Sequence, residues 1–118
     1  MLILHCIKEK LYEEMREDRY FGKVLLKNNP FIHCSSIEYF WRVSPHFANE
    51  KEKLVLLVID TDNLDVPVKW EDLEGCGREY PHIYGLVKME AIKNVLPYLK
   101  KEDGTWIKNE ELKHIADK

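Results

Sequence analysis

Runs of apolar residues predict several short strands. Leu54 to Ile59 are six consecutive apolar residues that end at Asp60, a pattern typical of a strand buried on both faces, and we expect this to be the central strand. Leu2 to Ile7 form a second apolar run, interrupted only by His5, which predicts an interior strand at the start of the fold. Weaker strand patterns follow at Phe31 to Cys34, Val66 to Trp70, Tyr80 to Leu86 and Thr105 to Ile107.

Three helices are predicted from apolar spacing and capping residues. Residues 9–19 place apolar side chains four positions apart, as on one face of a helix. Ser35 and Glu38 have the spacing of a capping box, which predicts a helix from about Ile37. Pro45 kinks or divides that helix because proline lacks the amide proton that a helix interior needs. Residues 109–116 carry apolar side chains on one face, which predicts a docked terminal helix.

These elements predict an α+β fold. A chain of 118 residues, 45% of them apolar, has the size and composition of one globular domain. We therefore expect a single domain over residues 1–118, with its core motifs in residues 2–100 and a C-terminal hairpin and helix in residues 101–118.

Charge and cysteine content narrow the function classes. A formal net charge of −3 provides no general field for nucleic-acid phosphates, so no nucleic-acid partner is expected. No stretch approaches the length of about 20 apolar residues that a membrane span needs, and the first residues do not resemble a secretory signal. Three cysteines without CxxC spacing argue against a disulfide framework or a zinc ribbon. A cytoplasmic location with reduced thiols is the expectation.

Histidine–cysteine pairs occur on two of the predicted strands. In His5-Cys6 and His33-Cys34, neighbouring side chains point to opposite faces, so both histidines share a face if both cysteines pack into the core. Ser35 then lies on the same side as His33. The alternative is that each histidine is separately hydrogen bonded in the core or at its rim. Alternation also argues against Cys34 as a nucleophile activated by His33.

Two further pairs stand at predicted strand ends, where clefts form. Trp70-Glu71 and His82-Ile83-Tyr84 add an indole, a carboxylate, an imidazole and a phenol to the candidates. Core packing for Trp70 and a solvated strand end for Glu71 are the alternatives. A zinc site built from His5, His33 and His82 is weakly supported, because no two of them have a spacing typical of metal ligands, and no metal site is predicted.

Five motifs stand in chain order: Leu4-His5, Phe31 to Ser35, Leu54 to Asp60, Val68 to Glu71 and Tyr80 to Gly85. Together they resemble a family of small bacterial proteins of unknown function that looks like an ADP-ribosyltransferase-type fold. The resemblance implies a split mixed β-sheet with flanking helices and a cleft between its halves. It also implies that His5 holds NAD near the nicotinamide ribose and that Tyr84 stacks on the ligand. The expected catalytic glutamate is missing from its strand, which leaves Glu71 or Glu79 nearby.

The leading hypothesis is a domain that binds NAD or a related nucleotide in a histidine-lined cleft, with weak ADP-ribosyl transfer or glycohydrolase activity. The predicted catalytic residues are Glu71 and His82, and the predicted ligand-binding residues are His5, His33, Ser35, Trp70 and Tyr84. The alternative is a non-catalytic module that binds a protein or a metabolite, in which the histidines are structural. A protein partner is not identified by the sequence.

Overall fold

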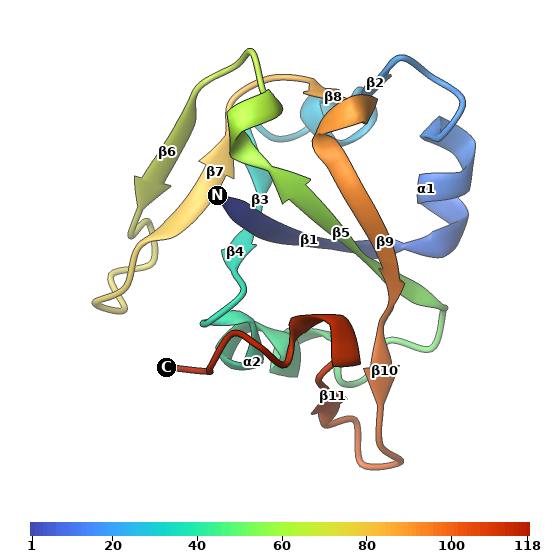
Figure 1. Ribbon diagram of the computed structural model, residues 1–118, viewed down its shortest axis with the longest axis vertical. Coiled ribbons are helices and arrows are strands. Elements are labelled where there is room, and N and C mark those ends of the chain that lie inside the picture. The colour runs from blue at the N-terminus through green and yellow to red at the C-terminus, as the bar shows by residue number, and fades with distance from the viewer.

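The computed structural model describes residues 1–118 as two main antiparallel sheets, of four and three strands, two short strand pairs, β2 with β8 and β10 with β11, and short helical segments around them (Figure 1). The strands are β1 (Leu2–Lys8), β2 (Tyr20–Phe21), β3 (Ile32–His33), β4 (Ser35–Ser36), β5 (Leu54–Asp60), β6 (Val68–Glu71), β7 (Tyr80–Ile83), β8 (Val87–Lys88), β9 (Ile92–Pro97), β10 (Leu99–Lys100) and β11 (Trp106–Ile107). The helices are α1 (Glu9–Met15) and α2 (Phe40–Val43), and the 3-10 turns are η1 (Leu25–Lys27), η2 (Ser44–Phe47), η3 (Thr61–Asn63), η4 (Met89–Ala91) and η5 (Glu110–Leu112).

The larger sheet has the strand order β4-β1-β5-β9, and its two central strands separate two apolar cores. Along β5, Leu57 and Ile59 face one core, whereas Leu56 and Val58 face the other. All four side chains are buried, because β5 is covered on both faces. The prediction of a central buried strand at Leu54 to Ile59 is therefore confirmed.

The smaller sheet has the order β3-β7-β6, and its two faces differ in character. Ile32 pairs with Ile83, and both pack into the first core. The next pairs along the strands, His33 with His82 and His82 with Lys69, lie on the opposite face because side chains alternate. The smaller sheet thus carries an apolar face towards the core and a polar face away from it.

Cys34 alone separates the two sheets along the chain, between the end of β3 and the start of β4. Its amide N–H donates to the carbonyl oxygen of Pro81 at 3.1 Å, which keeps it joined to the smaller sheet. Ser35, the next residue, already pairs with Leu4 in the larger sheet. The chain therefore changes sheets within one residue.

Several sequence expectations need correction. The strand pairs are antiparallel throughout, so the expected mixed sheet is wrong. Parallel pairing usually needs a long helical crossover, and α1 has only seven residues. The capping box at Ser35 and Glu38 is also wrong, because Ser35 belongs to β4. The hydroxyl oxygen of Ser36 instead accepts from the amide of Tyr39 at 3.3 Å, one residue before α2.

The C-terminal segment differs from its prediction as well. Only η5 forms where a helix was expected over residues 109–116. The backbone bonds in this segment span three residues, as in Leu112 to Asn109 and Ile115 to Leu112, and the ammonium of Lys108 also donates to the carbonyl oxygen of Ile115 and to the carboxylate of Asp117. Pro45 does divide its helix as expected, since α2 ends at Val43 and η2 follows. None of the helices has the length and apolar character needed to cross a membrane.

Candidate functional site

A cleft of about 680 Å³ lies between the loop that joins β6 to β7 and the α2–η2 segment. The β6–β7 loop is on the left in Figure 1, with α2 below β4 and α1 on the right. Ligand sites of proteins commonly have volumes of about 300–1,000 Å³. The lining residues are His33, Cys34, Trp41, Arg42, Val43, Pro45, His46, Phe47, Glu71, Asp72, Leu73, Glu74, Cys76, Arg78, Tyr80 and His82.

Glu71, at the end of β6, accepts two hydrogen bonds on one carboxylate oxygen. The hydroxyl of Tyr84 donates to Oε1 at 2.7 Å, and Nδ1 of His82 lies 2.9 Å from the same atom. The hydrogen bond from Tyr84, followed by that from His82, holds the pKa of Glu71 below its ordinary value. The same contact with Glu71 raises the pKa of Tyr84. Glu71 is therefore ionised near neutral pH, and Oε2 has no protein partner.

His82 is oriented by this carboxylate. Because an ionised carboxylate can only accept, Nδ1 of His82 must carry the proton, and Nε2 is the ring nitrogen left for a ligand. The ring of Phe31 stacks on the imidazole with centroids 4.2 Å apart and planes 23° apart. His82 as a whole is only 4% exposed, but its Nε2 atom is not fully buried. The imidazole is thus fixed on one side and open on the other.

His33 lies beside His82 on the neighbouring strand. The two ring centroids are 5.1 Å apart in an edge-to-face arrangement. Burial within the cleft and then the charge of His82 lower the pKa of His33 from its ordinary value, with an opposing contribution from Glu74. The ring of His33 makes no hydrogen bond within the protein, so it is available to a ligand in its neutral form.

The opposite wall of the cleft is largely apolar. Trp41, Val43, Pro45 and Phe47 come from α2 and η2, and Leu73 reaches towards them from the β6–β7 loop. Trp41 and Leu73 are exposed by 40% and 60%. The cleft therefore combines a polar floor with a hydrophobic wall, as in most small-molecule sites.

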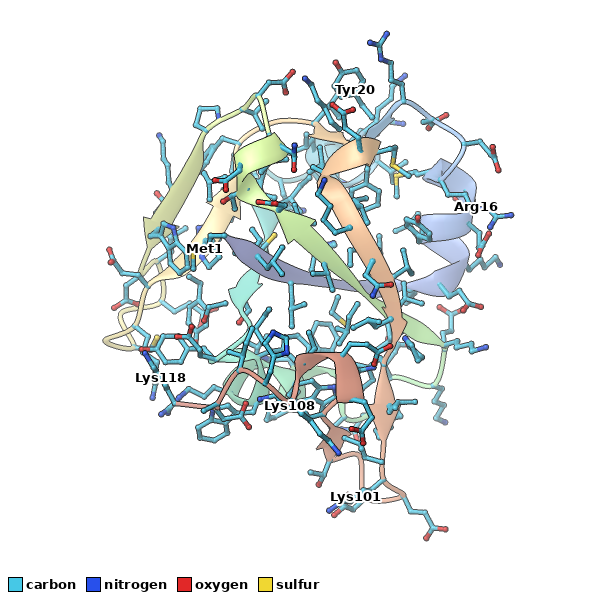
Figure 2. All side chains as sticks on the ribbon, in the orientation of Figure 1. Met1, Arg16, Tyr20, Lys101, Lys108 and Lys118 are labelled. Carbon is cyan, nitrogen blue, oxygen red and sulfur yellow. The ribbon has the colours of Figure 1, made fainter.

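Two arginines line the cleft, and their surroundings differ. Nε of Arg42 donates to the carbonyl oxygen of Lys118 at 2.9 Å, and Trp41 donates to the same oxygen at 3.0 Å. Lys118 is labelled in Figure 2 beside the lower part of the molecule. Arg78, in contrast, is half-buried and makes no hydrogen bond or ion pair through its guanidinium. Arg78 is the cation of the cleft that remains free for an anion.

The β6–β7 loop is held by hydrogen bonds within itself. The two carboxylate oxygens of Asp72 accept from the amides of Cys76 at 2.9 Å and Gly77 at 2.8 Å. Gly75 and Gly77 adopt positive φ angles of 69° and 85°, which glycine tolerates best. The loop that carries Leu73 and Arg78 is accordingly pre-shaped.

His5 does not reach the cleft. It faces the first core between Ile3 and Ile7, and its Nδ1 donates to the carbonyl oxygen of His33 at 2.6 Å. Nε2 is buried without a partner, and burial lowers the pKa of His5 to about 4. His5 therefore supports the backbone of His33 from behind, and the three imidazoles of the candidate zinc site do not converge.

The other predicted site residues are divided between the cleft and its surroundings. Ser35 is buried in the larger sheet, where its hydroxyl donates to the carbonyl oxygen of Ser36 at 2.8 Å. Trp70 points away from Glu71 because adjacent strand residues face opposite sides, and it is 37% exposed. Tyr84 does not line the cleft, but its hydroxyl donates to Glu71, which does. Cys34 lines the cleft, but burial raises the pKa of its thiol, which keeps it protonated.

Sequence reasoning missed four residues that shape the site: Phe31, Trp41, Asp72 and Arg78. Phe31 could have been found, since it lies two residues before His33 and so shares its face. Asp72 ahead of a Gly-Cys-Gly segment also has the form of a side-chain-capped turn. Trp41 and Arg78 carry no such local signal.

The fold and the site define an α+β protein with antiparallel sheets and a cleft floored by a carboxylate-anchored histidine. The chain belongs to the family described as "Protein of unknown function (DUF952)", which matches residues 6–95. The crystal structure of protein CC0527 from Caulobacter crescentus is similar in fold, with a TM-score of 0.81 and 22% identity over 96% of this chain and 99% of that one. The solution NMR structure of CC0527 gives a TM-score of 0.73 and 22% identity over 98% and 97% of the two chains. No curated protein matches the chain.

Proposed function

We propose that the cleft binds a nucleotide, with NAD and ADP-ribose as the leading candidates, and that Glu71 and His82 act on the bound ligand. The observation that carries the proposal is the anchored imidazole. Glu71 fixes Nδ1 of His82 at 2.9 Å, while Nε2 remains open on the cleft floor. A histidine held in one tautomer by a carboxylate is the usual arrangement for a general acid or base.

The chemistry of the lining fits the parts of a nucleotide. The apolar wall of Trp41, Val43, Pro45, Phe47 and Leu73 suits a base or a nicotinamide ring. Oε2 of Glu71, which has no protein partner, suits a ribose hydroxyl, and the unpaired guanidinium of Arg78 suits a phosphate. Glu71 also supplies the carboxylate that the ADP-ribosyltransferase resemblance requires, whereas Glu79 does not line the cleft.

Structural histidines, the alternative reading, describe His5 well. Its ring is sealed between the core and the carbonyl oxygen of His33. The same reading does not explain His82, because a purely structural histidine needs no carboxylate partner beside an open cleft. The ligand-binding role is therefore assigned to His33, Glu71 and His82, with His5 and Tyr84 as their supports.

The test is a titration with NAD, ADP-ribose and AMP, followed by thermal shift and by two-dimensional NMR of the histidine side chains. A ligand at about 100 times its dissociation constant stabilises the protein by about 2.7 kcal/mol. We expect the signals of His33 and His82 to move together while that of His114, which is exposed outside the cleft, stays in place.

A matched pair of variants locates the phosphate. Arg78→Gln should weaken binding of ADP-ribose at least tenfold, whereas Arg16→Gln on the far side of the molecule should leave it unchanged (Figure 2). If none of the three ligands moves the His33 and His82 signals at millimolar concentration, nucleotide binding is wrong.

A further inference from the structure

We propose that His33 and His82 form a base–acid pair that hydrolyses a phosphoester of a small nucleoside phosphate, with a 2′,3′-cyclic phosphate as the simplest substrate of the class. This inference rests on the proposed nucleotide cleft and names the bond that is attacked. It differs from cleavage of the nicotinamide glycosidic bond, which is the reaction implied by the resemblance to ADP-ribosyltransferases.

The geometry of the two rings carries the inference. Their centroids are 5.1 Å apart, and they come from adjacent strands that fix their separation through the His33–His82 register. Both rings line the cleft. One phosphoryl group can accept or share a hydrogen bond of about 2.8 Å with each ring through two of its oxygens. Two imidazoles at this spacing can serve the attacking and the leaving oxygen of the same phosphate.

Opposite surroundings give the two rings different tasks. His82 has the carboxylate of Glu71 beside it at 2.9 Å, which would stabilise an imidazolium, so we assign it the role of the acid. His33 has no such hydrogen-bonded partner. Burial and then the charge of His82 lower its pKa against an opposing contribution from Glu74, so we assign it the role of the base.

The charges of the cleft favour a phosphoester over a glycosidic bond. Glycosidic cleavage builds positive charge on the sugar, which the guanidinium of Arg78 in the same cleft would disfavour. Hydrolysis of a phosphoester builds negative charge on phosphate oxygens, which the imidazolium of His82 and the unpaired guanidinium of Arg78 would stabilise.

The reaction step balances without any further reagent. A water molecule attacks phosphorus, and Nε2 or Nδ1 of neutral His33 takes one of its protons. The bond from phosphorus to one ribose oxygen breaks, and Nε2–H of His82 gives its proton to that oxygen. The products are a nucleoside monophosphate and a histidine pair whose proton has moved from His82 to His33, and exchange with solvent restores the pair.

The rate should depend on pH, because His33 must be neutral to act as the base. Rates should fall at low pH, when His33 gains a proton. Charged and titratable groups that face the pair from all surrounding segments are Glu71 and Lys69 of β6, Asp72, Glu74, Cys76 and Arg78 of the β6–β7 loop, Tyr80 and Tyr84 of the β7 segment, Cys34 after β3, and Arg42 and His46 of α2 and η2.

The experiment follows 2′,3′-cyclic AMP by phosphorus NMR across pH, with His33→Ala, His82→Asn and His114→Ala beside the unaltered protein. The asparagine amide of His82→Asn can still donate to Glu71, which protects the fold. We expect each cleft variant to lower kcat at saturating substrate at least 100-fold, and His114→Ala to change nothing.

The outcomes separate this inference from the proposed function. Turnover that falls at low pH and that both cleft variants abolish supports the base–acid pair. Binding at His33 and His82 without turnover overturns this inference and leaves the nucleotide cleft standing. Turnover that survives in both cleft variants also overturns it, because another group or a contaminating nuclease is then responsible. Absence of binding overturns both proposals.

Discussion

His5 and His82 are both almost fully buried on strands, and they show how little burial says about the role of a histidine. Each uses Nδ1 in one hydrogen bond, at 2.6 Å for His5 and 2.9 Å for His82. The partner of His5 is a backbone carbonyl, whereas the partner of His82 is a carboxylate. Nε2 of His5 is sealed in the core, whereas Nε2 of His82 opens to the cleft.

The difference belongs to the two sheets as a whole. Both faces of β1 and β5 are covered by apolar side chains, so a polar group there must find its partner within the core. Only one face of the β3-β7-β6 sheet is covered, and the polar residues gather on the other. The larger sheet therefore separates the two cores, and the smaller one presents the polar residues of the cleft.

Truncation of Leu57 should have the largest effect on stability. Leu57 pairs with His5 and is fully buried, so Leu57→Ala should lower the free energy of unfolding by about 2–5 kcal/mol in urea denaturation. The matched change in the cleft, Leu73→Ala, removes a side chain that is 60% exposed and should cost no more than about 0.5 kcal/mol while weakening ligand binding. Equal losses of stability in the two variants would contradict the division between the sheets.

The pH dependence of stability sharpens the comparison at His5 itself. Its pKa is about 4 in the folded protein and about 6.5 when unfolded, so the unfolded state binds more protons between these values. The neutral ring thus contributes about 3 kcal/mol above pH 6.5, and this contribution is lost as the pH falls towards 4. His5→Asn keeps a donor for the carbonyl oxygen of His33 and removes the titration. Its unfolding free energy should fall less steeply between pH 6.5 and 4 than that of the unaltered protein, as measured by urea denaturation.

The local sequence pattern was enough to predict the buried central strand of the larger sheet, but not the role of His5 in that sheet. The unbroken apolar run at Leu54 to Ile59 has no stable place outside a buried strand. Around His5, however, Ile3 and Ile7 share its face while Leu4 lies on the other. Because both faces of β1 are apolar, the alternation of side chains could not predict which face would border the cleft. In the structure, both faces of β1 border the two cores, and neither borders the cleft.

Long-range pairing decided the rest of the site. Ser35 follows His33 by two residues, but its pairing with Leu4 of β1 draws it into the other sheet. Glu71 and His82 are eleven residues apart and meet because the β6–β7 hairpin pairs Glu71 with Tyr80 and Lys69 with His82. That register depends on the loop held by Asp72, which the sequence suggests only as a turn. Both residues were predicted as candidates, but not their contact.

Tyr84 offers the smallest and most local test of the comparison. Tyr84→Phe removes the 2.7 Å hydrogen bond to Oε1 of Glu71 and leaves that of His82 in place. The loss should lower the free energy of unfolding only slightly, since Glu71 remains partly solvated. Because the hydrogen bond from Tyr84 contributes most to the lowered pKa of Glu71, that pKa should rise when carbon NMR follows the carboxyl group. Tyr39→Phe, whose hydroxyl makes no hydrogen bond within the protein, is the control and should leave the titration of Glu71 unchanged. An unaltered pKa of Glu71 in Tyr84→Phe would show that His82 alone lowers that pKa. Glu71 would then depend on a single hydrogen-bond partner, as His5 depends on the carbonyl oxygen of His33.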